Sequence, residues 1–167
     1  MINNDMLIKS LKEELKQYNY IEHIQGLFNN VDYLSIIATP RRFATRYICS
    51  ITNLPEDVNE LSQVSIFFEQ IRKSLINQYA KFPYFKELGT YNIIFCSDHM
   101  YEIISEHLEK FVDKSGLHMN VMLGTIFINT NTYEHMYKST WGLYYSGKHF
   151  EAMLKEVSTW CENQIDV

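Results

Sequence analysis

The stretch from Gly116 to Gly147 constrains the fold most, because it joins a long apolar run to a returning ribbon rich in aromatic side chains. The run from Met119 to Asn129 contains no charged residue, which predicts a buried strand. The polar sequence 129–132 predicts a turn, so Tyr133 to Tyr145 is expected to return as a hairpin partner. The other elements should pack around these two strands.

The segment before this pair predicts a crossover unit. Residues 90–97 are apolar and typical of a central strand, and Asp98 is expected to cap a helix that Gly116 ends. A strand, a helix and a strand in this order favour two parallel, adjacent strands. Alternation along the second strand predicts one core-facing side made of Met119, Val121, Leu123, Thr125 and Phe127.

The rest of the chain supplies three helices and a meander. Periodicity and turn residues predict helices over residues 4–19 and 61–79, strands over 21–28, 32–39 and 42–51, and a last helix capped by Ser146. The order αβββαβαββα predicts an α/β fold, with α+β as the alternative. We expect one domain over residues 1–167, with a mixed sheet of about six strands and helices on both faces.

The first helix, the meander, the second helix and the following strand are similar in layout to the restriction-endonuclease-like core. Nucleases of that type hold magnesium with an acid on the second strand and with an acid two residues before a lysine on the third. Asp32 could stand for the first acid, but residues 42–51 contain no Asp, Glu or Lys. The resemblance therefore implies a nuclease-like layout without its metal site.

Composition narrows the class of protein. The chain carries 15 basic and 20 acidic residues, a net charge of −5, which argues against nucleic-acid binding through the phosphate backbone. The cysteines, Cys49, Cys96 and Cys161, are predicted to be buried reduced thiols, which favours the cytoplasm. The charged N-terminus and the lack of a long apolar run predict neither a signal peptide nor a membrane span. The histidine spacing predicts no metal, and no motif predicts a cofactor.

Arginines are concentrated in one predicted strand. Arg41, Arg42 and Arg46 lie where no acid occurs between Asp32 and Glu56. Alternation places Arg42 and Arg46 on one side, about 13 Å apart at their stems, which suits two anionic groups of a ligand or partner. The alternatives are an edge strand protected by positive charge, and ion pairs with glutamates on a covering helix.

Two further features could bind a partner or an anion. Residues 142–149 fit the GxxxxGK frame weakly, and the milder interpretation is an anion near Lys148 at a helix start, against a solvated lysine on a capped helix. Aromatic side chains crowd the ribbon, with Trp141 and Tyr145, and the loop with Tyr84 and Lys86. Such aromatics form interface hot spots or pack in the core.

A catalytic interpretation remains as a rival. Cys96 ends the predicted central strand and could act as a nucleophile with His118 or His149, provided that one of these histidines lies within hydrogen-bond reach. No motif decides whether the chain is an enzyme.

Our leading hypothesis is a non-enzymatic cytoplasmic interaction module. It would bind a protein partner or itself through the aromatic ribbon and the arginine-bearing strand. One alternative is a small enzyme or ligand-binding protein for a phosphate- or carboxylate-bearing small molecule. The second alternative is a degenerate nuclease-like domain that binds nucleic acid.

Overall fold

The computed structural model describes residues 4–40, 45–80, 88–116, 121–142 and 145–166. The elements in chain order are α1 (Asp5–Leu15), the 3-10 helix η1 (Lys16–Tyr18), β1 (Glu22–Phe28), β2 (Val31–Ala38), β3 (Arg46–Asn53), α2 (Leu61–Tyr79), β4 (Leu88–Cys96), α3 (Asp98–Ser105), the 3-10 helix η2 (Leu108–Phe111), β5 (Met122–Asn129), β6 (His135–Ser139) and α4 (Gly147–Ile165). This order confirms the predicted succession of helices and strands.

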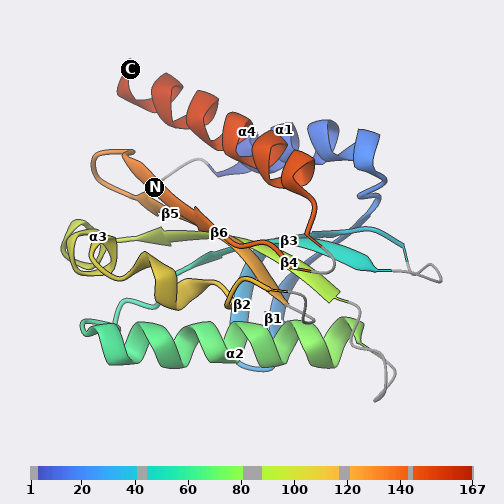
Figure 1. Ribbon diagram of the computed structural model, residues 1–167. Helices are drawn as coiled ribbons and strands as arrows, with labels where there is room; N and C mark the ends of the chain where they lie inside the picture. The colour runs from blue at the N-terminus through green and yellow to red at the C-terminus, as the bar shows by residue number, and fades with distance from the viewer. Residues whose placement is uncertain (1–3, 41–44, 81–87, 117–120, 143–144, 167) are drawn as a thin grey trace.

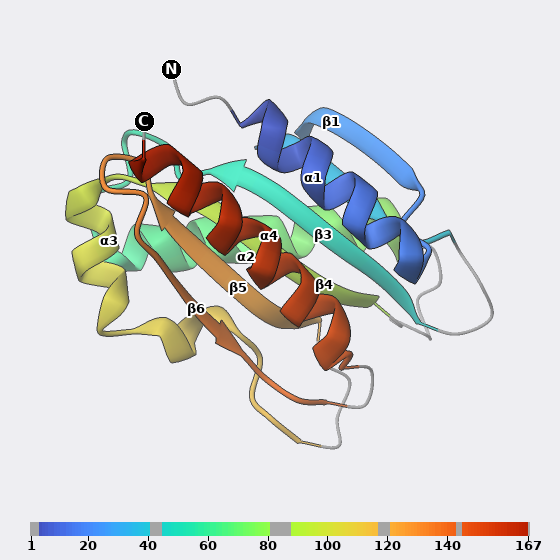
Figure 2. The same ribbon diagram turned by 90° about the horizontal axis from the view of Figure 1, so that it is seen from above.

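The strands form one six-stranded mixed sheet in the order β1-β2-β3-β4-β5-β6. Neighbours β1, β2 and β3 run antiparallel, β3, β4 and β5 run parallel, and β6 returns antiparallel to β5. Helices α1 and α4 lie side by side over one face, and α2 covers the other (Figures 1 and 2). The predicted α/β architecture with helices on both faces is therefore confirmed.

The covering helices form because their apolar stripes meet the sheet. In α1 the side chains of Leu7, Leu11 and Leu15 are fully buried at helical spacing. Met6, which precedes Leu7 in the sequence, lies off this stripe and is 66% exposed. Helix α2 begins with a capping box between Glu60 and Gln63, which satisfies backbone N–H groups of its first turn.

The two central strands are buried on both faces. Every residue of β4 and of β5 is buried, as expected for parallel strands covered by helices. The predicted single face of β5 is wrong at Leu123, which packs on the α4 side, whereas Phe127 packs on the α2 side. The register of β5 against β4 shifts between Met122 and Gly124, and this irregularity moves Leu123 to the opposite face.

Two other local predictions are corrected at α3. Its N-cap is Ser97, whose hydroxyl accepts a hydrogen bond from the Met100 N–H at 3.4 Å, and Asp98 is the first helical residue. Gly116 does not end this helix, since α3 stops at Ser105. At the last helix, Ser146 is the N-cap, as predicted, although its side chain makes no capping hydrogen bond.

The first part of the chain has the predicted order of a helix, three strands, a helix and a strand. The β1-β2-β3 meander is antiparallel, and β4 lies parallel beside β3. Within the described part of the chain, β3 carries no Asp, Glu or Lys on Arg46–Asn53. Over the same described residues, no helix is both long and apolar enough to cross a membrane.

Candidate functional site

The described arginine of the predicted basic strand is engaged within the protein. Arg46 pairs with the Glu22 carboxylate of β1 and lies over the ring of Tyr79, with its guanidinium carbon 4.6 Å from the ring centroid. Its side chain is 14% exposed. Because β3 lies inside the sheet, the edge-strand explanation of its charge is wrong, and the ion pair forms with a strand rather than with a helix.

Several residues singled out in the sequence lie outside the described residues. They are Arg41, Arg42, Tyr84, Lys86 and His118. Their roles in binding or catalysis remain predictions.

The residue before α4 is held by two hydrogen bonds to Tyr91. The Ser146 N–H donates to the Tyr91 hydroxyl at 3.1 Å, and that hydroxyl donates to the Ser146 carbonyl at 2.9 Å. Lys148 is exposed and Tyr145 is half-buried. The N–H of Ser146 is thus already satisfied. The anion interpretation of this helix start also depends on the N–H groups of residues 147–149 and on Lys148, and it remains a prediction.

His149 lies in a cluster of tyrosine rings at the end of the sheet where the central strands β3 and β4 begin. Its Nδ1 lies 2.9 Å from the Tyr20 hydroxyl, and its ring centroid lies 4.7 Å from Tyr18 and 4.6 Å from Tyr47. Burial lowers the pKa of His149 to about 4, so the ring is neutral at physiological pH. A neutral ring held by tyrosines fits a structural role.

Cys96 lies at the other end of β4. Its thiol donates to the Ile128 carbonyl at 3.7 Å, it is 2% exposed, and burial raises its pKa to about 12. Residues 91 and 96 are five positions apart on one strand, or about 16 Å, so the cluster of His149 beside Tyr91 is out of hydrogen-bond reach of Cys96. The structure therefore does not bring this nucleophile and this base together.

The edge strand β6 and the residues that follow it carry the exposed part of the aromatic ribbon. Tyr137 is 50% exposed and Trp141 is 53% exposed. Other members of the ribbon are covered: the Tyr133 ring meets the Trp160 ring edge-on at 5.7 Å, and Tyr145 packs against the α4 core. The ribbon is thus divided between core packing and a half-exposed surface.

Over His135–Ser139, one side of the β6 backbone has no hydrogen-bond partner among the described residues, and the nearest backbone bond beyond the strand runs from the Gly116 N–H to the Trp141 carbonyl at 3.2 Å. The Thr140 N–H donates to the Leu123 carbonyl, and the Asn129 N–H donates to the Glu134 carbonyl, each at 2.9 Å. These two bonds flank β6, so the backbone groups of its even-numbered residues point towards β5. By alternation, the backbone groups of 135, 137 and 139 point away from the sheet. No backbone hydrogen bond reaches these outward groups from another segment of the described chain.

The opposite edge is protected. Strand β1 has a register shift between Ile24 and Gly26, and Gly26 adopts a φ of +116°, a backbone conformation that favours glycine. Glu22 at the start of β1 is held by Arg46. Bulges and charges of this kind discourage pairing with another strand, so β6 is the more open edge.

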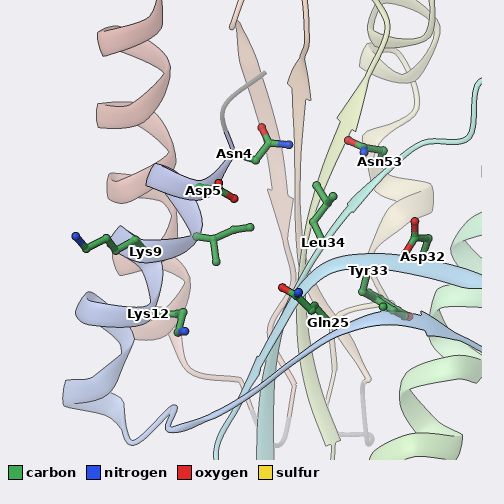
Figure 3. A pocket seen from close by; sticks show the side chains of 11 residues that line it. Asn4, Asp5, Lys9, Lys12, Gln25, Asp32, Tyr33, Leu34 and Asn53 are labelled. Atoms are coloured by element: carbon green, nitrogen blue, oxygen red, sulfur yellow. The ribbon is translucent and has the colours of Figure 1, made fainter. Parts of the chain in front are cut away.

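Two hollows open near the end of the sheet where β2 begins and β3 ends. The larger, about 970 Å³, lies between α1 and the sheet, and its lining carries charges of both signs, including Lys12 and Asp32. Figure 3 shows Lys9 on its rim pointing away from the sheet. The smaller hollow, about 600 Å³, shares Asp32 and Asn53 with it and extends to the carboxyl ends of β3 and β4.

These hollows were missed from the sequence because their lining comes from distant segments. Asp32 and Glu56, for example, lie on β2 and in the loop before α2. The one available signal was their isolation in the sequence, since no acid lies between them. Over the described ranges, no group of three or more His, Cys, Asp or Glu side chains is placed to hold a metal ion.

Comparison with known proteins gives no significant match to a family model, to a curated protein or to a solved structure.

Proposed function

We propose that the protein is a non-enzymatic interaction module that forms a homodimer by pairing β6 with β6 of a second copy. The observation that supports this most is the open edge of β6, on which Tyr137 is 50% exposed beside outward backbone groups. Unpaired edge backbone is the usual template for adding a strand, and tyrosine and tryptophan are enriched among interface anchors.

An antiparallel pair about a two-fold axis at Tyr137 uses the free side of the strand. Tyr137 then faces its own copy, and residue 135 of each strand faces residue 139 of the other. In such pairs each facing couple exchanges two N–H···O=C hydrogen bonds, so three couples would supply about six hydrogen bonds. The two six-stranded sheets would join into one continuous sheet.

The charges of β6 are compatible with this register. Lys138 is the charged residue of the strand, and the two-fold places it opposite Met136 of the second copy rather than opposite another lysine. The two Tyr137 rings would meet on the α4 side, where each ring already lies 6.1 Å from Phe150. A cross-strand aromatic pair contributes about 0.2–1 kcal/mol.

We place this dimer in the cytoplasm. The described cysteines, Cys49, Cys96 and Cys161, are all buried and unpaired. Free thiols in a folded core are typical of proteins kept in a reducing compartment.

Light scattering during size-exclusion chromatography tests the dimer directly. The chain has a mass of 19.8 kDa, and we expect the wild-type protein to elute at twice that mass. Tyr137→Lys places like charges opposite each other at the axis, and we expect it to weaken dimerisation at least about tenfold. Leu27→Lys, at a side chain that is 70% exposed on the opposite edge, is the control and should leave the dimer intact.

A charge-swap experiment identifies the position of the axis. Tyr137→Glu should also yield a monomer, because two carboxylates would face each other. Mixing the Tyr137→Lys and Tyr137→Glu proteins should restore the dimer, since a lysine then faces a glutamate. A monomeric wild-type protein at high concentration, or a mixture that stays monomeric, would overturn the proposal.

A further inference from the structure

We infer that the hollow at the carboxyl ends of β3 and β4 binds a small organic cation, namely a primary amine with an apolar chain. The hollow measures about 600 Å³, within the range of about 300–1,000 Å³ that is typical of ligand pockets. It lies where parallel strands end, which is the usual position for ligands in open α/β sheets. This ligand site is separate from the β6 edge.

The charged side chains among the described residues that line the hollow are acidic. Asp32 and Glu56 are its charged residues, and no Lys, Arg or His occurs among the described residues that line it. Both side chains are exposed at the rim, and neither forms an ion pair with a described residue. The hollow therefore attracts a cation and repels a carboxylate or phosphate.

Part of the lining of the hollow is apolar and in contact with water. Leu27 is 70% exposed and Val58 is partly exposed, whereas Leu54, Phe67 and Met100 also line the hollow but are only 8%, 5% and 2% exposed. An inorganic ion would leave Leu27 and Val58 in contact with water. An alkyl chain of a few carbon atoms would cover them, which selects an amphipathic cation over a metal ion or ammonia.

Polar groups beside the two acids match the donors of an ammonium group. The side chains of Asn30, Asn53 and Thr130 also line the hollow, and each offers an oxygen acceptor. A primary ammonium carries three N–H donors and no acceptor, so it can bond to a carboxylate and to neighbouring amide or hydroxyl oxygens together.

Helix α3 starts at this hollow, but it does not change the preference of the hollow for a cation. The N-terminus of α3 carries a partial positive charge, which by itself would favour an anion. Asp98 occupies its first turn, and the Asp98 carboxylate accepts a hydrogen bond from the Asn129 side chain at 2.7 Å. The negative charge of Asp98 offsets the partial positive charge of the helix end. Asp32 and Glu56 therefore determine the sign of the charge that the hollow attracts.

Three probes of equal chain length separate charge from apolar contact: hexylamine, hexanol and hexanoate. Titration at neutral pH, followed by amide and methyl NMR shifts, should give hexylamine a Kd of about 1 mM, which is reasonable for a ligand of this size. Shifts should centre on Val58 and Met100 of the lining. Hexanol should bind at least about threefold more weakly, and hexanoate should not compete with hexylamine.

Isosteric variants test the two acids. Asp32→Asn and Glu56→Gln should each raise the Kd for hexylamine at least about threefold, and the double variant should bind hexylamine and hexanol equally. Asp57→Asn is the matched control, because Asp57 is exposed in the same loop but does not line the hollow. The amide spectra of these variants show whether the fold is retained.

Three results would overturn the inference. Hexanoate could bind as tightly as hexylamine, Asp57→Asn could weaken binding as much as Glu56→Gln, or hexylamine at about ten times the expected Kd could leave the Val58 and Met100 signals unchanged.

Discussion

Replacing His149 with glutamine should remove a large part of the acid sensitivity of the fold. In the folded chain, burial among Tyr18, Tyr20 and Tyr47 lowers the pKa of His149 to about 4, from an ordinary value of about 6.5. Between these two values the unfolded chain binds a proton that the folded chain excludes. The free energy of unfolding must therefore decrease as the pH falls from 6.5 towards 4, and it levels off below the folded pKa.

The magnitude follows from the two pKa values. At pH 5, the ratio of the unfolded and folded binding polynomials gives a loss of about 2 kcal/mol relative to pH 7.5 for this one side chain. With a urea m-value of about 2 kcal/mol/M, the unfolding midpoint of the wild-type protein should fall by about 1 M through His149 alone. His149→Gln keeps an acceptor for the Tyr20 hydroxyl but does not titrate in this range.

Urea unfolding monitored by tryptophan fluorescence at several pH values measures the effect. Burial also lowers the pKa values of His23 and His135, so some acid sensitivity remains in the variant, and the difference between the two proteins isolates His149. An NMR titration of the His149 ring provides a direct check. Equal pH dependence of the two proteins, or a ring that titrates near 6.5, would refute the reasoning.

Two further substitutions test the packing of the sheet. Gly124→Ala should destabilise the fold by about 1–3 kcal/mol in urea unfolding, because its Cβ would lie 2.6 Å from the Phe150 ring. Asp113→Asn should lower the free energy of unfolding by about 1–3 kcal/mol at pH 7. The reason is that Asp113 pairs with Arg72 and accepts hydrogen bonds from the Val121 and Met122 N–H groups at 2.7 and 2.9 Å. The control Asp57→Asn should change the free energy of unfolding by less than about 0.5 kcal/mol. Burial alone raises the pKa of Asp113, but the hydrogen bonds from Arg72 and from the Met122 and Val121 N–H groups lower it overall, so its contribution is lost only as the pH falls below about 4.

The element order was predictable because local signals agreed with the tertiary arrangement. The strand-helix-strand pattern that ends in β5 predicted parallel neighbours, and β4 and β5 are parallel. Leu7, Leu11 and Leu15 repeat at helical spacing because one face of α1 meets the sheet. Each of these features depends on residues close together in the sequence.

The incorrect predictions concern residues whose partners lie far away in the sequence. Nothing near Asp113 in the sequence indicates its partner Arg72, which lies on α2, 41 positions away. The side of Leu123 changed because of a register shift that depends on β4. Arg46 was expected to serve a ligand or a covering helix, but its partner Glu22 is on β1. Pairings of this kind depend on the sheet order and on loop geometry, for which a single sequence carries little signal.

The two proposed sites are far enough apart to fail or succeed separately. The proposed two-fold axis passes Tyr137, which pairs with Ile126 in the middle of β5. The nearest lining residue on that strand's path is Thr130, four positions further along, or about 13 Å from Ile126. A lysine at position 137 and an amine in the hollow are both positively charged. The lysine is nevertheless too distant to contact the amine. The Tyr137→Lys and Tyr137→Glu variants can for this reason serve as controls in the amine titration. Loss of both dimerisation and amine binding in one variant would indicate a damaged fold, whereas loss of dimerisation alone is what strand pairing at β6 requires.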